Sequence, residues 1–107
     1  MTVSSLQNHG FKPLALPCGD REISGVYIGD LLSWVMSHAK PDNAWITVMS
    51  NINVIAVASL VDVSCVIIAD EDVLTEDVIA VAKEKNINIL STTSPIYETA
   101  VAISELL

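Results

Sequence analysis

The segment Ser64-Cys-Val-Ile-Ile-Ala69 is a continuous apolar run that is rich in β-branched residues. Such a run is typical of a strand buried on both faces in the interior of a parallel sheet. Shorter runs of the same kind alternate with helical patterns along the chain, at Gly25–Ile28, Trp45–Met49 and Asn88–Leu90. This alternation predicts an α/β domain with a mostly parallel sheet of four or five strands, covered by helices.

Three predicted helices lie between these strands, at Leu31–Ala39, Ile52–Leu60 and Glu76–Lys85, and a last helix has Pro95 at its first position. A short helix at Ser4–His9 and a possible edge strand at Pro13–Leu16 precede them. Residues with small polar side chains stand where the helices should begin and are expected to cap them: Asp30, Ser50 or Asn51, Thr75 and Ser94. The helix Ile52–Leu60 is apolar nearly all round, so we expect it to be buried on two sides.

The length of 107 residues indicates a single domain, residues 1–107. Hydrophobic residues make up 51% of the chain and charged residues 17%, which excludes disorder. The net charge is −8, and the few cations are scattered, so nucleic-acid and anionic-membrane partners are disfavoured. No secretory signal opens the chain, and Cys18 and Cys65 form no CxxC pair, so a reducing cytoplasm with free thiols is expected.

Neither of two common nucleotide-binding motifs is present, the P-loop GxxxxGK[ST] and the dinucleotide fingerprint GxGxxG. No pair among His9, His38 and the cysteines has the spacing of local metal ligands. Asp70-Glu-Asp72 follows the strongest strand and could hold a divalent cation, but a solvated loop explains it better. We therefore expect no catalytic residues, no metal and no cofactor.

The carboxyl ends of the strands form the edge of a parallel sheet where ligands bind. Small polar side chains are expected on this rim, beside helix N-termini that favour anions: Asp30, Ser50, Asn51, Asp70, Thr92 and Ser94. Contact with a small anionic metabolite or a nucleotide is one interpretation of these residues. Helix capping explains several of them equally and is the more common role.

Asp20 and Arg21 lie in a loop bracketed by Gly19 and Gly25. Arg21 is the one arginine of an acidic chain, and arginine suits bidentate recognition of a carboxylate or phosphate. We expect Arg21 to pair with a carboxylate and fix this loop, with ligand contact as the second possibility.

A surface for self-association is predicted from the excess of aliphatic residues over charged ones. The triplet Trp34-Val-Met36 cannot point inward as a whole, because a helix on a sheet buries one stripe. Trp34 and Met36, together with Ile55 of the uncharged helix, are therefore the candidate residues of a homodimer interface. The alternative is that Trp34 folds over the sheet edge.

The segment Gly19-Asp-Arg-Glu-Ile-Ser-Gly-Val-Tyr-Ile-Gly-Asp-Leu-Leu-Ser33 resembles a DRTGG domain. The resemblance continues through Trp45-Ile-Thr, the helix Ile52–Leu60, Val66-Ile-Ile and Ile89-Leu-Ser-Thr92, and covers about Val3 to Leu107. The string DRTGG itself is absent, and Asp20-Arg-Glu-Ile-Ser-Gly25 is the nearest segment.

The DRTGG family is similar to the N-terminal domain of HPr kinase/phosphorylase, which implies a three-layer α/β/α fold. Members occur fused to CBS domains, inorganic pyrophosphatases or phosphotransacetylases, and free-standing ones are encoded near iron hydrogenases of anaerobic bacteria. The resemblance implies a regulatory or assembly module of bacterial metabolism, often dimeric, without kinase activity.

Three functions remain open at this point. The first is a non-catalytic homodimeric module that senses a metabolite or docks on a metabolic enzyme. The second is a small enzyme or phosphate-transfer protein with its site at the rim, and the third is a purely structural dimerisation domain.

Overall fold

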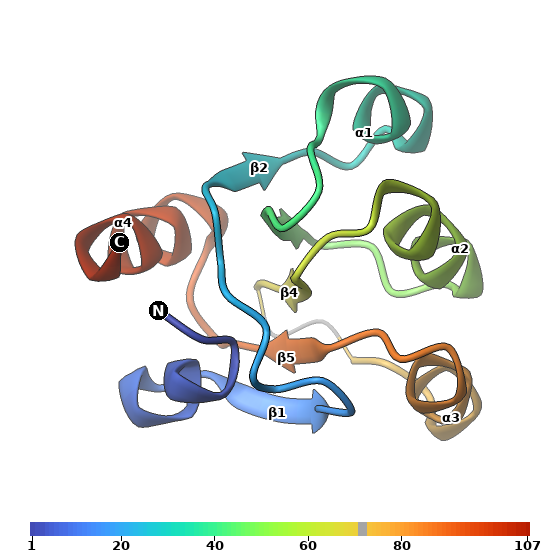
Figure 1. Ribbon diagram of the computed structural model, residues 1–107, viewed down its shortest axis with the longest axis horizontal. Helices are drawn as coiled ribbons and strands as arrows, with labels where there is room; N and C mark the ends of the chain where they lie inside the picture. The colour runs from blue at the N-terminus through green and yellow to red at the C-terminus, as the bar shows by residue number, and fades with distance from the viewer. Residues whose placement is uncertain (71–72) are drawn as a thin grey trace.

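A computed structural model describes residues 1–70 and 73–107 of the chain (Figure 1). Its strands form one five-stranded sheet in the order β1-β5-β4-β3-β2. The strands are β1 (Lys12–Ala15), β2 (Val26–Ile28), β3 (Ala44–Thr47), β4 (Cys65–Ile68) and β5 (Ile89–Ser91). The helices are the 3-10 helix η1 (Ser4–His9) and the α-helices α1 (Leu32–His38), α2 (Ile52–Val61), α3 (Glu76–Glu84) and α4 (Ile96–Leu106).

Strands β2 to β5 run parallel, and β1 joins the edge of the sheet antiparallel to β5. Helices α1, α2 and α3 cover one face, while η1 and α4 cover the other (Figure 1). The predicted three-layer α/β/α fold with a mostly parallel sheet is therefore confirmed. The edge position predicted for the proline-containing strand is confirmed as well, because Pro13 lies in β1.

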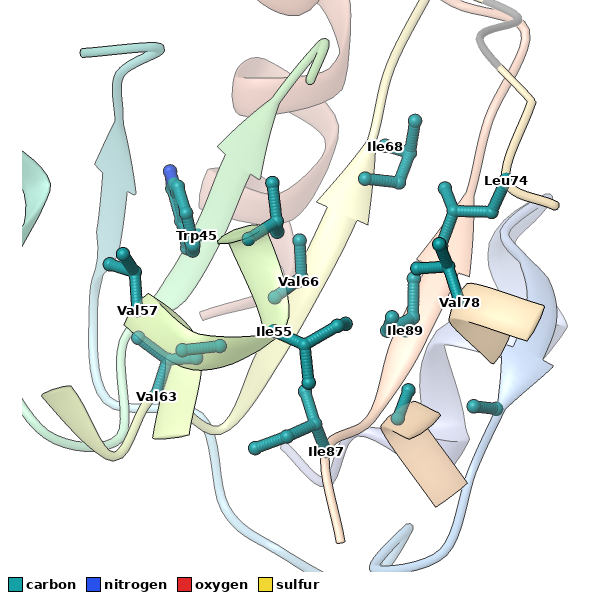
Figure 2. Close-up of a cluster of buried hydrophobic side chains, with 14 of the residues drawn as sticks. Trp45, Ile55, Val57, Val63, Val66, Ile68, Leu74, Val78, Ile87 and Ile89 are labelled. Atoms are coloured by element: carbon teal, nitrogen blue, oxygen red, sulfur yellow. The ribbon is translucent and has the colours of Figure 1, made fainter. Parts of the chain in front are cut away.

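The central strand β4 is completely buried, as its apolar run predicts. Its side chains alternate between the two layers, since successive residues of a strand point to opposite faces. Val66 and Ile68 pack with Trp45 and Ile89 under the α1–α3 layer (Figure 2). Cys65 and Ile67 pack on the α4 side. The sheet thus separates two apolar clusters.

Two of the predicted helix caps are wrong, and a third has the predicted position without the side-chain hydrogen bond of a cap. Leu31, not Asp30, is the N-cap of α1, and Pro95, not Ser94, is the N-cap of α4. Thr75 does occupy the N-cap of α3, but its side chain forms no capping hydrogen bond. Asn51 is confirmed as a cap, because its side-chain oxygen accepts a 2.9 Å hydrogen bond from the Asn53 amide at the start of α2.

Helix α2 is buried on its sheet side and flanked by α1 and α3, but its outer stripe is exposed. Ile52 and Leu60 lie on that stripe, with exposed fractions of 46% and 73%. Ile55 lies in the core with 2% exposure, so its assignment to an interface was wrong. The reason is that a helix apolar on all sides does not reveal in sequence which stripe faces the sheet.

None of the helices among residues 1–70 and 73–107 is long and apolar enough to cross a membrane.

Candidate functional site

Asp30 connects the carboxyl ends of β2 and β3. Its Oδ1 accepts a 2.7 Å hydrogen bond from the hydroxyl of Thr47 and a 3.0 Å bond from the Val48 amide. Thr47 is completely buried, and its Oγ1 in turn accepts a hydrogen bond from the Met49 amide. Asp30 therefore satisfies the buried Thr47 hydroxyl and the Val48 amide at the rim. It does not cap α1, because the helix begins one residue later than predicted and Leu31 holds the N-cap position.

A second group of rim residues joins the ends of β4 and β5. The Asp70 amide donates a 2.9 Å hydrogen bond to the Ser94 carbonyl, and Asp70 adopts a positive φ of 59°. The Ser94 amide donates to Thr92 Oγ1 at 3.2 Å. The structure thus brings Asp70, Thr92 and Ser94 together at the rim, and ligand contact by these residues stays a prediction.

The other rim residues have separate surroundings. Asn51 is occupied as the cap of α2, and Ser50 is half-buried beside it. The acidic cluster proposed after β4 includes Glu71 and Asp72, which lie outside the described residues. Within the described part of the chain, no three His, Cys, Asp or Glu side chains form a group that could hold a metal ion.

A cavity of about 450 Å³ opens at the carboxyl end of β5, between β1, β5 and α3. Its polar lining comes from Lys12 and the hydroxyl residues that end β5, and its apolar lining from residues of β1 and α3 and the loop before α3. The lining residues are Gly10, Lys12, Leu14, Val73, Leu74, Ile79, Ser91, Thr92 and Thr93. Of these, Thr92 belongs to the predicted rim, whereas the other lining residues were not predicted.

Lys12 reaches this cavity through the register of the antiparallel pair. It lies opposite Ser91, so the beginning of β1 is placed at the carboxyl end of β5. The sequence indicates β1 only as a possible edge strand, and it contains no signal for the neighbour or direction of that strand. Long-range pairing between β1 and β5 therefore places Lys12 in the cavity, where it is the single lysine among the described lining residues.

Arg21 lies near the amino ends of β3 and β4, away from the rim. Its guanidinium donates to Asp42 Oδ1 at 2.6 Å and to Asp62 Oδ1 at 3.0 Å, and the two pairs are salt bridges. Desolvation lowers the pKa of Arg21, but the hydrogen bonds that Arg21 donates to Asp42 and Asp62, together with their negative charges, outweigh it and raise the pKa overall. The expected carboxylate pairing is present, and ligand contact at Arg21 stays a prediction.

Asp20, the neighbour of Arg21, is exposed. Asn88 also holds the same loop, and no sequence pattern points to it. The buried Asn88 side chain accepts from the Cys18 amide at 2.9 Å and donates to the carbonyls of Cys18 and Ser64. Its partners are 70 and 24 residues away in sequence, so no local pattern could have revealed them.

Trp34 and Met36 point outward from α1, with exposed fractions of 57% and 46%, while Val35 between them is buried. This confirms that the apolar triplet cannot all face the core. Trp34 stacks on His38 with ring centroids 4.5 Å apart, so its ring lies along its own helix. The outer surface of α1 and α2 therefore exposes apolar side chains next to uncharged polar ones such as Ser33, Asn53 and Ser59. The exposed apolar side chains are Leu31, Trp34, Met36, Ile52 and Leu60.

The fold and these surroundings define an α/β domain with a polar rim, a cavity beside it and an apolar outer surface. The model of the DRTGG domain family matches residues 18–106, so the chain belongs to that family. The DRTGG resemblance seen in the sequence is thereby confirmed.

A solved structure with the same fold is that of the CBS and DRTGG domains of the regulatory region of Clostridium perfringens pyrophosphatase, complexed with the activator diadenosine tetraphosphate. The two chains are 14% identical, with a TM-score of 0.75. The similarity covers 97% of this chain and 46% of the other, so the chain spans about half the length of that neighbour. No curated protein matches the sequence.

Proposed function

We propose that this DRTGG domain is a non-catalytic regulatory module of bacterial metabolism that acts as a homodimer and responds to a small metabolite or docks on a metabolic enzyme. Family membership supports the proposal, as does the neighbour, in which a DRTGG domain is part of a regulatory region. That region is complexed with a nucleotide activator, which supports a nucleotide as one candidate ligand here. The free thiols of Cys18 and Cys65 fit the cytoplasmic setting that we propose.

The hydrogen bonds of Asp30 and Asn51 at the rim support a non-catalytic role for the domain. Asp30 binds Thr47 and Val48, and Asn51 caps α2. Each of these groups already satisfies a backbone or buried donor, which is a structural role. A catalytic acid, base or nucleophile instead needs a polar atom aimed at the substrate.

The observation that supports a homodimer is the absence of charged residues from two neighbouring helices. Helices α1 and α2 contain no Asp, Glu, Lys or Arg, whereas α3 and α4 carry several, including Glu76, Lys83 and Glu98. On a surface helix the outer face normally holds the charged residues. The outer surface of α1 and α2 instead lacks charged residues and exposes Trp34 and Met36, which matches the depletion of charge and the enrichment of Trp and Met in interface centres.

A second copy of the chain is the partner that this surface fits. Two chains of net charge −8 repel each other. The electrostatic repulsion between two copies is smallest when they associate through a face that carries no charges. A twofold contact places the same patch on both sides, so Trp34 and Leu60 of one copy face the same apolar patch of the other.

Thermal melting with and without nucleotides separates the proposal from its alternatives. A ligand that binds the folded chain raises the melting temperature by mass action. A rise with AMP, ATP or diadenosine tetraphosphate supports ligand sensing, whereas no rise with any ligand or enzyme partner favours a purely structural dimerisation domain. Turnover of ATP or phosphorylation of HPr that survives repurification would instead establish the small enzyme.

A further inference from the structure

The connections after β4 and β5 leave the sheet toward opposite faces. The chain passes from β4 to α3 in the α1–α3 layer, and from β5 to α4 in the other layer (Figure 1). Neighbouring parallel strands with this arrangement form a topological switch point, where the two loops diverge and leave a crevice for a ligand. The parallel strands before β4 all send their helices to the same face, so the switch point of this sheet lies between β4 and β5.

The 450 Å³ cavity borders this switch point on the β1 side of β5, because its described lining includes residues of β1 and β5 but none of β4. Val73 and Leu74, from the loop that leads to α3, line one part of it, and Thr92 and Thr93, from the loop that leads to α4, line another. Ligand pockets in proteins occupy roughly 300–1,000 Å³ and combine an apolar wall with a few polar groups. The cavity therefore touches both of the loops that diverge at the switch point.

The lining of the cavity indicates the chemistry of its ligand. Lys12 provides an ammonium group, and none of the salt bridges among the described residues uses it. Ser91, Thr92 and Thr93 add hydroxyl groups, which donate to phosphate or carboxylate oxygens and to sugar hydroxyls. Leu14, Leu74 and Ile79 form an apolar wall suited to an aromatic ring or an acyl chain.

The charge of the ligand is limited by the same residues. A single lysine lines the described cavity, and the whole chain carries a net charge of −8. One cation cannot neutralise a polyphosphate, and the surrounding negative potential opposes its approach. We propose that this cavity binds an organic anion of one or two charges with an aromatic or other apolar body, such as a nucleoside monophosphate or an aromatic acid of similar size.

This site deepens the proposed function by naming the ligand class that a sensing module would take. It rests on that function for its biological meaning, but its test is independent of oligomeric state. The test is a titration of the full chain, followed by amide NMR, with AMP and with the aromatic sulfonate 8-anilinonaphthalene-1-sulfonate as probes. Adenosine, inorganic phosphate and ATP serve as comparison ligands.

We expect at least one of the two probes to shift the amides of Lys12, Leu74 and Ser91–Thr93, and to bind more tightly than inorganic phosphate or ATP. Lys12→Met keeps the length of the side chain but removes its charge, and should weaken anion binding about tenfold, the loss expected for one charge-assisted contact. Lys12→Arg should restore most of the affinity. Lys40→Met removes the same charge from an exposed turn outside the cavity lining and should change nothing.

The proposal is overturned if neither probe binds at millimolar concentration, or if the shifted amides lie elsewhere. It is equally overturned if Lys12→Met and Lys40→Met weaken binding alike, since that would be a general charge effect, or if ATP binds more tightly than both probes. The same spectra show whether each variant is folded. If the chain is a dimer but no probe binds the cavity, the proposed ligand site is refuted and the proposed homodimeric module is not.

Discussion

Arg21 donates hydrogen bonds to both the side chain and the main chain of Asp62, at 3.0 Å each. Asp62 is the residue at which α2 ends, and it adopts a positive φ of 66°. Arg21 also binds Asp42, which has a positive φ of 67° in the turn before β3. One arginine thus joins its own loop to the two turns that lead into β3 and β4.

Replacement of Arg21 by alanine should therefore destabilise the fold. The guanidinium of Arg21 and the carboxylates of Asp42 and Asp62 are all partly exposed, so the two ion pairs contribute little to the free energy of unfolding. The hydrogen bond to the Asp62 carbonyl contributes a similar small amount. We expect a loss of about 1–2 kcal/mol, or several degrees in melting temperature. Arg21→Lys should recover part of it, since lysine keeps the charge but not the planar fork.

The matched comparison for Arg21 is Lys40→Ala, which removes a cation from an exposed turn. An unchanged melting temperature for Arg21→Ala, together with lost ligand binding, would reverse the assignment and make Arg21 a binding residue.

Asp30 offers a test that separates capping from bridging. Asp30→Ala leaves the buried Thr47 hydroxyl and the Val48 amide without their acceptor, so we expect a loss of about 1–3 kcal/mol. Asp30→Ser should be as destabilising as alanine, because serine can cap a helix but is too short to reach Thr47 as aspartate does. Stability measured by denaturant unfolding checks this, and a serine variant as stable as the wild type would mean that Asp30 acts as a cap after all.

Cys65 is completely buried in β4, and burial raises the pKa of its thiol from 9.0 to about 12 despite a hydrogen bond from Ser64. A thiolate is the reactive form, so Cys65 should resist thiol reagents at pH 8 in the native protein. Cys18 is half-buried in a loop and should react first. A count of reactive thiols before and after denaturation checks this, and two equally fast thiols in the native state would contradict it.

The same shift in the pKa of Cys65 predicts how stability depends on pH. Between pH 9 and pH 12 the unfolded thiol loses its proton while the folded thiol keeps it, so the free energy of unfolding falls as the pH rises. Cys65→Ala lacks this contribution and is the control for other titrating groups. From pH 9 upward, we expect the free energy of unfolding of the wild type to fall relative to that of Cys65→Ala. A difference between the two that stays constant with pH would refute the prediction.

The proposed dimer surface predicts which substitutions release monomers. Trp34→Asp and Leu60→Asp place charges on the uncharged outer surface of α1 and α2, where two copies would meet. Both residues are more than half exposed, so the variants should remain folded, as circular dichroism would show. Tyr97→Asp is the matched control, because Tyr97 is 74% exposed on α4 in the opposite layer.

Sedimentation of these variants identifies the surface. Monomers from Trp34→Asp and Leu60→Asp, with a dimer retained in Tyr97→Asp, are the expected result. Monomers from Tyr97→Asp alone would place the interface on the α4 side.

Much of the fold follows from local sequence. The buried strand β4 and the order of helices and strands are visible in short apolar runs and their spacing, because these patterns depend on residues near one another. The outward positions of Trp34 and Met36 follow in the same way from the single stripe that a helix can bury. Even the cap at Asn51 is a local interaction.

The errors concern partners that are distant in sequence. Asp30 forms its hydrogen bonds with Thr47 and Val48, 17 and 18 residues away, and these replace the local capping bond. Lys12 reaches the cavity because β1 pairs with β5, 79 residues further along at Ser91. Ile55 was misplaced because α2 has apolar residues on every side, so only packing on the sheet decides which stripe is exposed.

Sedimentation equilibrium of the wild-type chain tests the central claim most directly. A stable twofold contact buries more than about 1,000 Å² in total, which the outer surface of α1 and α2 must supply. The account predicts a mass of twice the 11.5 kDa of one chain at micromolar concentration. A mass of 11.5 kDa that does not change as the concentration is raised would contradict it.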